Sequence, residues 1–151
     1  MSVTLRPVRA DDERVLTEML AAVRHPMLMG LGLDADAVST LAYHDAEMHD
    51  YACDRAYPHS AWEAITVDGE PVGRLITHTT PERIVLVDIF IAPEHQRRGI
   101  GSLVLGAELE RAGSRPVEVR VDRGSPAEAW YAAFGFEPVD GDALQLSMIR
   151  S

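Results

Sequence analysis

The sequence predicts one domain, residues 1–151, with a mixed α/β fold in which helices pack on a mostly antiparallel sheet. Three apolar segments of strand length follow one another at residues 62–67, 72–79 and 84–91. The dipeptide Asp68-Gly69 between the first two is typical of a hairpin turn. Segments with the apolar spacing of helices come before and after these strands. The expected order is strand, two helices, three strands, helix, strand, helix and two strands.

The first third of the chain is expected to form a strand from Val3 to Val8 and two helices. Asp11 can cap the first helix, and Pro26 marks its end. The apolar face of that helix comprises Val15, Leu16, Met19, Leu20 and Val23. After a loop from Gly30 to Leu33, the second helix is expected from Asp36 to Asp54. Its apolar face comprises Val38, Leu41, Met48 and Tyr51, and its other face His44, Asp45, Glu47 and Asp50.

The last third is expected to continue with a helix from Leu103 to Ala112 and a strand from Val117 to Val121. The run Ser125-Pro126-Ala127-Glu128 is typical of a helix start. The serine can cap, the proline fits the first helical position, and the glutamate can complete a capping box. This short helix is expected to end at Gly135. A final pair of strands is expected at Phe136–Val139 and Leu144–Ile149.

Composition limits the partners of the protein. All fourteen basic residues are arginine, and with twenty-four acidic residues they give a net charge of −10. Such a charge argues against nucleic acids and anionic membranes as partners. The single Cys53 cannot form an internal disulfide, and no segment has the pattern of a signal peptide or the length of a membrane span. We therefore expect a cytoplasmic protein.

A glycine-containing run after the third strand of the series predicts a phosphate-binding loop. It lies between an apolar strand and an apolar helix, where free backbone N–H groups and the helix dipole favour an anion. A Walker loop is excluded because it requires lysine, and a dinucleotide loop would need glycine or alanine where Val104 stands. A tight turn that needs glycine only for its geometry is the remaining alternative. The run consists of Gln96, Arg97, Arg98, Gly99, Ile100, Gly101 and Ser102.

Two separate patterns resemble the GNAT superfamily of N-acetyltransferases. Gln96, Gly99 and Gly101 match the pattern Gln/Arg-x-x-Gly-x-Gly/Ala of its pyrophosphate loop. Further along, Ala127, Trp130-Tyr131 and Gly135-Phe136 match the family's last helix in order and spacing. The resemblance covers the chain well from about Trp62 onward, and earlier only through the order of elements.

The resemblance implies a GNAT fold, in which the sheet splays between its fourth and fifth strands and acetyl-CoA binds in the wedge. It further implies that Gln96–Ser102 holds the pyrophosphate. Backbone groups of Ile89, Phe90 and Ile91 would pair with pantetheine, and an N–H near Phe90 or Ile91 would meet the oxyanion. The implied reaction is direct attack of a primary amine, on a small molecule or peptide, upon the thioester in a ternary complex.

Candidate catalytic residues follow from that reaction. Tyr131 matches the family's general acid, which would protonate the departing thiolate. Asp88 interrupts an apolar strand, and burial would raise the pKa of its carboxyl so that it could act as the base. A bulged or solvent-facing position is an equal alternative for Asp88. Glu63 and His78 on neighbouring strands are less favoured candidates for the base.

The sequence gives less support to a metal site or to a nucleophilic cysteine. No set of three or four residues has the spacing of a metal site, so we expect no metal. Cys53 is expected to be buried and inert, because its sequence neighbours are mainly acidic. The acids Asp45, Glu47 and Asp50 could attract a cationic acceptor, and a homodimer is possible. The rival hypothesis is a non-catalytic acyl-CoA-binding domain that keeps the fold for sensing or interaction.

Overall fold

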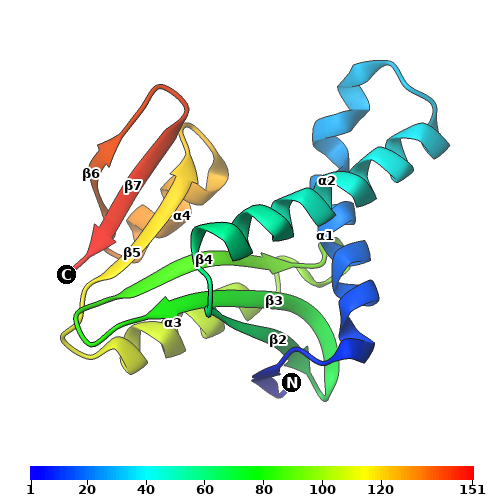
Figure 1. Cartoon of the computed structure of the whole chain (residues 1–151). Helices are drawn as coiled ribbons and strands as arrows, with labels where there is room; N and C mark the ends of the chain where they lie inside the picture. The colour runs from blue at the N-terminus through cyan, green and yellow to red at the C-terminus, as the bar shows by residue number, and fades with distance from the viewer.

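The computed structural model describes residues 1–151, and its centre is a seven-stranded sheet in the order β1-β2-β3-β4-β5-β7-β6 (Figure 1). Neighbouring strands are antiparallel except for β4 and β5, which are parallel. The mixed, mostly antiparallel sheet expected from the sequence is therefore confirmed. The strands are β1 Val3–Pro7, β2 Ala61–Val67, β3 Glu70–Thr79, β4 Ile84–Ile91, β5 Val117–Asp122, β6 Glu137–Gly141 and β7 Gln145–Arg150.

Helices cover both faces of the sheet. α1 and α2 lie on one face, and α3 lies on the other (Figure 1). The larger core lies on the α3 face, where Val104 and Leu105 pack against apolar strand residues. The smaller core lies under α1 and α2, around Leu16 and Phe90. The helices are α1 Glu13–Leu28, α2 Ala35–Ala56, α3 Ile100–Ala112 and α4 Pro126–Ala133, with single 3₁₀ turns η1 Ala10–Asp12, η2 Met29–Leu31 and η3 Pro93–His95.

Three local predictions about helix ends are wrong. α1 continues through Pro26 to Leu28, because a proline in the last turn removes only one hydrogen bond before the helix ends. Asp12, rather than Asp11, stands at the start of α1, and its carboxylate is held by Arg6. The Ser125 hydroxyl donates to the Asp122 carbonyl oxygen, so the capping box does not form.

The predicted apolar face of α2 is also wrong in large part. Leu41, Met48 and Tyr51 are exposed. The buried face instead carries small residues, which let α2 approach α1 and the sheet closely, so large side chains fit only outside. The buried residues of α2 are Val38, Ala42, Ala46 and Cys53.

An irregularity in β4 decides which way its side chains point. Ile76 pairs with Asp88, but the next residue of β3, Thr77, pairs with Leu86, so Val87 is an extra, bulged residue. A bulge shifts the alternation of side chains along the strand. Leu86 accordingly faces the α3 core, whereas Phe90 packs under α1 and α2.

The same strand separates from β5 close to the bulge. β4 pairs with β5 only from Ile84 to Leu86, opposite Val117 to Val119. Beyond this point β5 stays paired with β7, while Asp88–Ile91 has no partner on the β5 side. The splay between the fourth and fifth strands is therefore present, and it leaves one edge of β4 open.

Candidate active site

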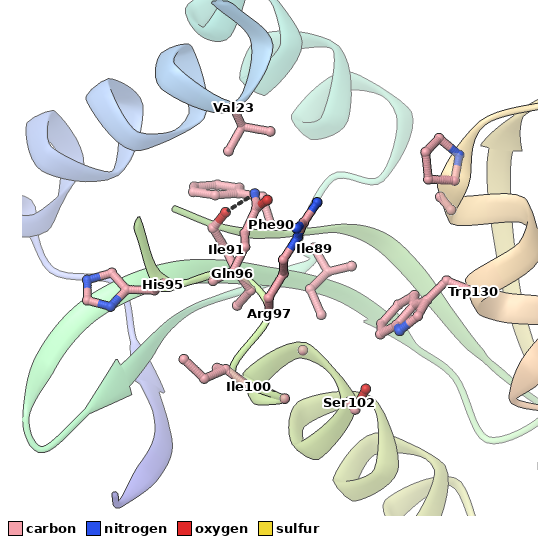
Figure 2. A pocket seen from close by; sticks show the side chains of 14 residues that line it. Val23, Ile89, Phe90, Ile91, His95, Gln96, Arg97, Ile100, Ser102 and Trp130 are labelled. Atoms are coloured by element: carbon pink, nitrogen blue, oxygen red, sulfur yellow. Dashed lines mark hydrogen bonds between the residues drawn. The ribbon is translucent and has the colours of Figure 1, made fainter. Parts of the chain in front are cut away.

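A cleft of about 580 Å³ opens where β4 and β5 separate (Figure 2). Its walls are the end of β4, the glycine loop, the start of α3 and one face of α4, with Val23 of α1 on the remaining side. The cleft thus joins the two regions that the sequence patterns indicated. Of the predicted cofactor residues, the lining includes Ile89, Phe90, Ile91, Gln96, Arg97, Gly99, Ile100, Gly101 and Ser102.

The glycine loop has the backbone geometry of an anion site. Arg97 and Gly99 have φ values of +64° and +79°, a conformation that turns successive N–H groups toward one side. Gly99 is the N-cap of α3, and its carbonyl oxygen accepts the first helical hydrogen bond, from Leu103. The first N–H groups of α3 therefore have no intrahelical partner and border the cleft.

Gln96 and Arg98 have positions that the sequence did not reveal. The Gln96 side chain donates to the Ile91 carbonyl oxygen at 2.9 Å, which ties the loop to the end of β4 (Figure 2). Arg98 is exposed, does not line the cleft, and lies with Nη1 3.2 Å from the Nδ1 atom of His95. Arg97 is consequently the one arginine of the loop that borders the cleft.

The open edge of β4 presents the backbone of alternate residues. The Phe90 carbonyl oxygen points to β3, since a Cβ added to Gly73 would lie only 2.1 Å from it. Backbone groups of successive strand residues point to opposite sides. Ile89 and Ile91 therefore face the β5 side, whereas the Phe90 carbonyl is turned away from it. The Phe90 prediction is in this respect not supported by the geometry.

α4 contributes two aromatic residues with different surroundings. Trp130 lines the cleft, and its ring lies 3.6 Å from the position a Cβ would take on Gly101. Tyr131 is only 4% exposed, and its ring packs edge-on against Trp130 and Phe136, with centroid distances of 4.9 and 5.2 Å. Burial, together with the negative charge of Asp88, raises the pKa of the Tyr131 phenol above its ordinary value. The phenol is therefore protonated at neutral pH.

Asp88 is held in a charged cluster on the α2 face of the sheet. Its Oδ2 accepts from Arg74 Nη2 at 3.1 Å, and its Oδ1 lies 3.4 Å from His49 Nε2. Arg74 also donates to both carboxylate oxygens of Asp50, at 2.8 and 3.0 Å. The guanidinium lies over the rings of Trp62 and Phe90, at 4.7 and 5.0 Å from their centroids.

This cluster corrects the expected titration of Asp88. Burial alone would raise the pKa of its carboxyl, as the sequence predicted. The contacts with His49 and Arg74 outweigh burial and hold that pKa below its usual value. The prediction of a raised pKa is wrong, because it considered only the apolar neighbours along β4.

Sequence reasoning missed His49 as a neighbour of Asp88. The ion pair with Asp88, helped by Cys53, raises the pKa of His49 to about 10. The Sγ atom of buried Cys53 lies 3.6 Å from His49 Nε2. The sequence offered a signal only for the contact between His49 and Cys53, which are four residues apart on a predicted helix and so lie on one face of it. It offered none for the contact of His49 with Asp88.

The other candidate bases lie elsewhere. Glu63 pairs with Leu75 of β3, which belongs to the core on the α3 face, so Glu63 lies on the face opposite Asp88. Burial and the charge of Glu108 raise the pKa of the Glu63 carboxyl. His78 stacks beside Tyr57, with 5.2 Å between ring centroids. No group of three or more His, Cys, Asp or Glu side chains is arranged to hold a metal ion. None of the helices combines the length and the apolar character needed to cross a bilayer.

Solved structures share this fold over nearly the whole chain. PaiA N-acetyltransferase from Thermoplasma acidophilum, in complex with coenzyme A, aligns with a TM-score of 0.68, at 15% identity, over 100% of this chain and 99% of its own. An acetyltransferase from Thermus thermophilus aligns with a TM-score of 0.69, at 24% identity, over 99% of this chain and 97% of its own. The ribosomal-protein-S18-alanine N-acetyltransferase from Escherichia coli aligns with a TM-score of 0.60, at 18% identity, over 99% of this chain and 93% of its own. No curated protein matches the chain in sequence.

A model of the acetyltransferase (GNAT) family matches residues 32–136. This segment is well over half of the chain. It includes the whole of β4, the glycine loop and α4. These are the elements that form the cleft, so sequence and geometry agree on the same region. The chain belongs to the GNAT family of acetyltransferases.

Proposed function

We propose that the protein is an N-acetyltransferase that transfers the acetyl group of acetyl-CoA to a primary amine of a small molecule or peptide. The observation that carries this proposal is the convergence of three features on one cleft. These are the open edge of β4, the free N–H groups at the start of α3, and Trp130 of α4, against which the buried Tyr131 packs. The coenzyme A bound to the Thermoplasma protein of the same fold supports the choice of co-substrate.

The cleft offers a separate place for each part of acetyl-CoA. The N–H groups of Ile100, Gly101 and Ser102 would bind the pyrophosphate, and Arg97 would add a positive charge. The backbone of Ile89 and Ile91 would pair with the pantetheine amides, as a further strand would. Gln96 has a supporting part, because its bond to the Ile91 carbonyl keeps the loop in place.

The reaction requires loss of a proton from the amine, stabilisation of an oxyanion and protonation of the departing thiolate. The chain offers groups for the last two. The amine nitrogen attacks the thioester carbon, and an N–H on the open edge of β4, at Ile89 or Ile91, would stabilise the oxyanion. The C–S bond then breaks, and Tyr131 would donate its proton to the thiolate. Asp88 does not line the cleft and is already paired with Arg74 and His49, so the protons of the ammonium form of the acceptor would pass to water before and after attack. Direct proton abstraction by Asp88 is disfavoured by its ion pairs.

Two measurements test the proposal together. Acetyl-CoA should raise the melting temperature through preferential binding to the folded state, whereas NAD should not. Release of free thiol should then accompany incubation with a panel of primary amines. Absence of a thermal shift at millimolar acetyl-CoA would refute cofactor binding. A thermal shift without thiol release for any amine would favour the rival acyl-CoA-binding domain.

A further inference from the structure

The outer side of α2 carries an exposed apolar strip. Leu41, Met48 and Tyr51 are 36%, 53% and 58% exposed, and Figure 1 shows α2 lying across the sheet with no element in front of it. Together with His44 they follow a spacing of three and four residues, which places all four side chains on one face of the helix. We call these four residues the α2 strip. None of them lines the cleft beside β4.

The spacing of the α2 strip is the one by which two helices pack side by side. Apolar residues at alternating intervals of three and four form the seam between paired helices. The opposite side of α2 is already buried against α1 and the sheet through Ala42 and Ala46. α2 therefore has two faces suited to packing, and only one of them is used within the chain.

The two ends of the α2 strip differ in shape. At the N-terminal end lies a depression of about 550 Å³, and Ala37, Thr40 and Leu41 are among the residues that line it. At the C-terminal end the exposed ring of Tyr51 protrudes. Arg55 holds this ring, with its guanidinium carbon 5.8 Å from the ring centroid and its Nη1 donating to the hydroxyl oxygen at 3.2 Å. One face of α2 thus presents a depression and, further along, a large side chain.

The same two ends carry opposite charges. Asp36 lines the depression, and Arg55 stands beside Tyr51 in the last turn of α2. Both are exposed, and neither forms a salt bridge within the chain. They lie about 28 Å apart along the helix, at a rise of about 1.5 Å per residue, so they cannot pair with each other in one copy. A second α2 running in the opposite direction would bring the arginine of each copy to the aspartate of the other.

We propose that the α2 strip binds the α2 strip of a second copy of this chain, so that the protein forms an antiparallel dimer with two-fold symmetry. Leu41 then lies opposite the partner's Tyr51, and His44 lies opposite the partner's Met48. Each tyrosine ring enters the depression of the other copy, and the two-fold axis repeats every contact. This interaction goes beyond acetyl transfer, because the strip is separate from the cleft.

One like-charge contact opposes the dimer. Glu47 is exposed and lies beside the α2 strip, close to the two-fold axis, so the two copies of Glu47 come near each other. The interface is also confined to one helix from each copy. We therefore expect a dissociation constant in the micromolar range, as for small interfaces that form and break readily. Glu47→Gln should tighten the dimer.

Sedimentation of the full-length protein measures this association directly. Between micromolar and millimolar concentration, at an ionic strength of about 0.15 M, the mass should rise from the 16.6 kDa of one chain to twice that value. Met48→Glu places a charge in the middle of the α2 strip and should raise the dissociation constant at least about tenfold. Leu103→Glu is the matched control, because Leu103 is an exposed apolar residue of α3, on the other face of the sheet. It should dimerise like the parent.

Charge reversal tests the antiparallel direction. Asp36→Arg and Arg55→Glu should each raise the dissociation constant about fivefold or more, because each variant alone places like charges together at both ends of its dimer. An equimolar mixture of the two variants should associate about as tightly as the parent, since both ends of the mixed pair again join opposite charges. In a parallel dimer each residue would meet its own copy, and neither variant alone would weaken association. Thermal unfolding of each variant checks that it is folded.

The outcomes separate this proposal from acetyl transfer. The dimer is overturned if the parent remains a monomer at millimolar concentration, which would leave the α2 strip to a partner of another kind. It is equally overturned if Met48→Glu dimerises as well as the parent, or if the mixed charge variants associate no better than each one alone. Coenzyme A should bind the parent and Met48→Glu alike. Failure to bind either protein would count against the proposed function and would leave the dimer intact.

Discussion

Asp88 on β4 accepts a hydrogen bond from Arg74 on β3, with 3.1 Å between Oδ2 and Nη2. The same guanidinium holds Asp50 of α2, so one buried cation joins two acids from different elements. Asp88 is therefore ionised at neutral pH, and its value to a reaction would lie in its fixed charge rather than in exchange of a proton.

Replacing Asp88 by Asn should test this distinction. The charge is lost, while Arg74 keeps its pair with Asp50. We expect kcat/KM to fall about tenfold, less than the roughly 10²–10⁴-fold contribution of a general base. The acidic limb of the pH profile should keep its position, because Asp88 does not set it. A limb that moves or disappears in Asp88→Asn would show that Asp88 exchanges the proton after all.

Replacing Tyr131 by Phe should remove the proton donor and keep the packing. The ring contacts with Trp130 and Phe136 do not require the hydroxyl. We expect kcat to fall about 10²–10⁴-fold with almost unchanged affinity for acetyl-CoA. Steady-state kinetics and calorimetry measure the two quantities. Tyr57→Phe is the control, since Tyr57 stacks with His78 away from the cleft. Loss of affinity with unchanged kcat would assign Tyr131 to binding.

Gly101→Val should block the cleft without unfolding the protein. A Cβ at Gly101 would lie 3.6 Å from the Trp130 ring, an ordinary contact, but its further methyl groups would occupy ligand space. We expect the Kd for coenzyme A to rise at least about tenfold, by calorimetry. Gly106→Val on the same helix is the matched control, because open space surrounds that position. Undiminished binding by Gly101→Val would contradict the proposed pyrophosphate site.

The His49 pair predicts a loss of stability in alkali. The folded-state pKa of His49 is raised to about 10 by Asp88, above an unfolded value of about 6.5. The stabilisation is therefore complete below pH 6.5 and is lost as the pH rises toward 10. Urea unfolding across this range should show a decline in the free energy of unfolding that His49→Gln reduces. Parallel curves for both proteins would mean that His49 titrates normally.

Gly73→Ala should destabilise the sheet where β3 meets the open strand. The new Cβ would lie 2.1 Å from the Phe90 carbonyl oxygen, so the backbone of β4 would have to move. We expect a loss of about 1–3 kcal/mol in the free energy of unfolding, measured with urea. Gly30→Ala is the control, because nothing lies within 4 Å of that added Cβ. Equal stability of the two variants would show that β4 adapts at no cost.

Local sequence patterns predicted much of this fold because they act over a few residues. Ile84–Ile91 is a strand with the predicted bounds, and Asp68-Gly69 forms the turn between β2 and β3. Gly135 has a φ of +91° just after α4, as expected for a glycine that ends a helix. The glycine loop was recognisable for the same reason, since its geometry depends on residues next to one another.

The face of α2 could not be predicted in this way. Leu41 and Met48 follow helical spacing as well as any buried pair, yet they are exposed. The face that α2 buries is decided by its fit against α1 and the sheet. Close packing there favours Ala42 and Ala46, and periodicity alone cannot distinguish small contacts from large ones.

The sequence by itself determined the elements, the glycine loop and the aromatic pair Trp130-Tyr131, because each depends on neighbours in the chain. Only the tertiary structure decided what surrounds Asp88. The bulge at Val87 turns Asp88 toward α2, and folding then brings His49 and Arg74 from distant segments against it. Electrostatic interactions depend on distance in space rather than in sequence, so the charge state of Asp88 was set by residues that no local pattern connects to it.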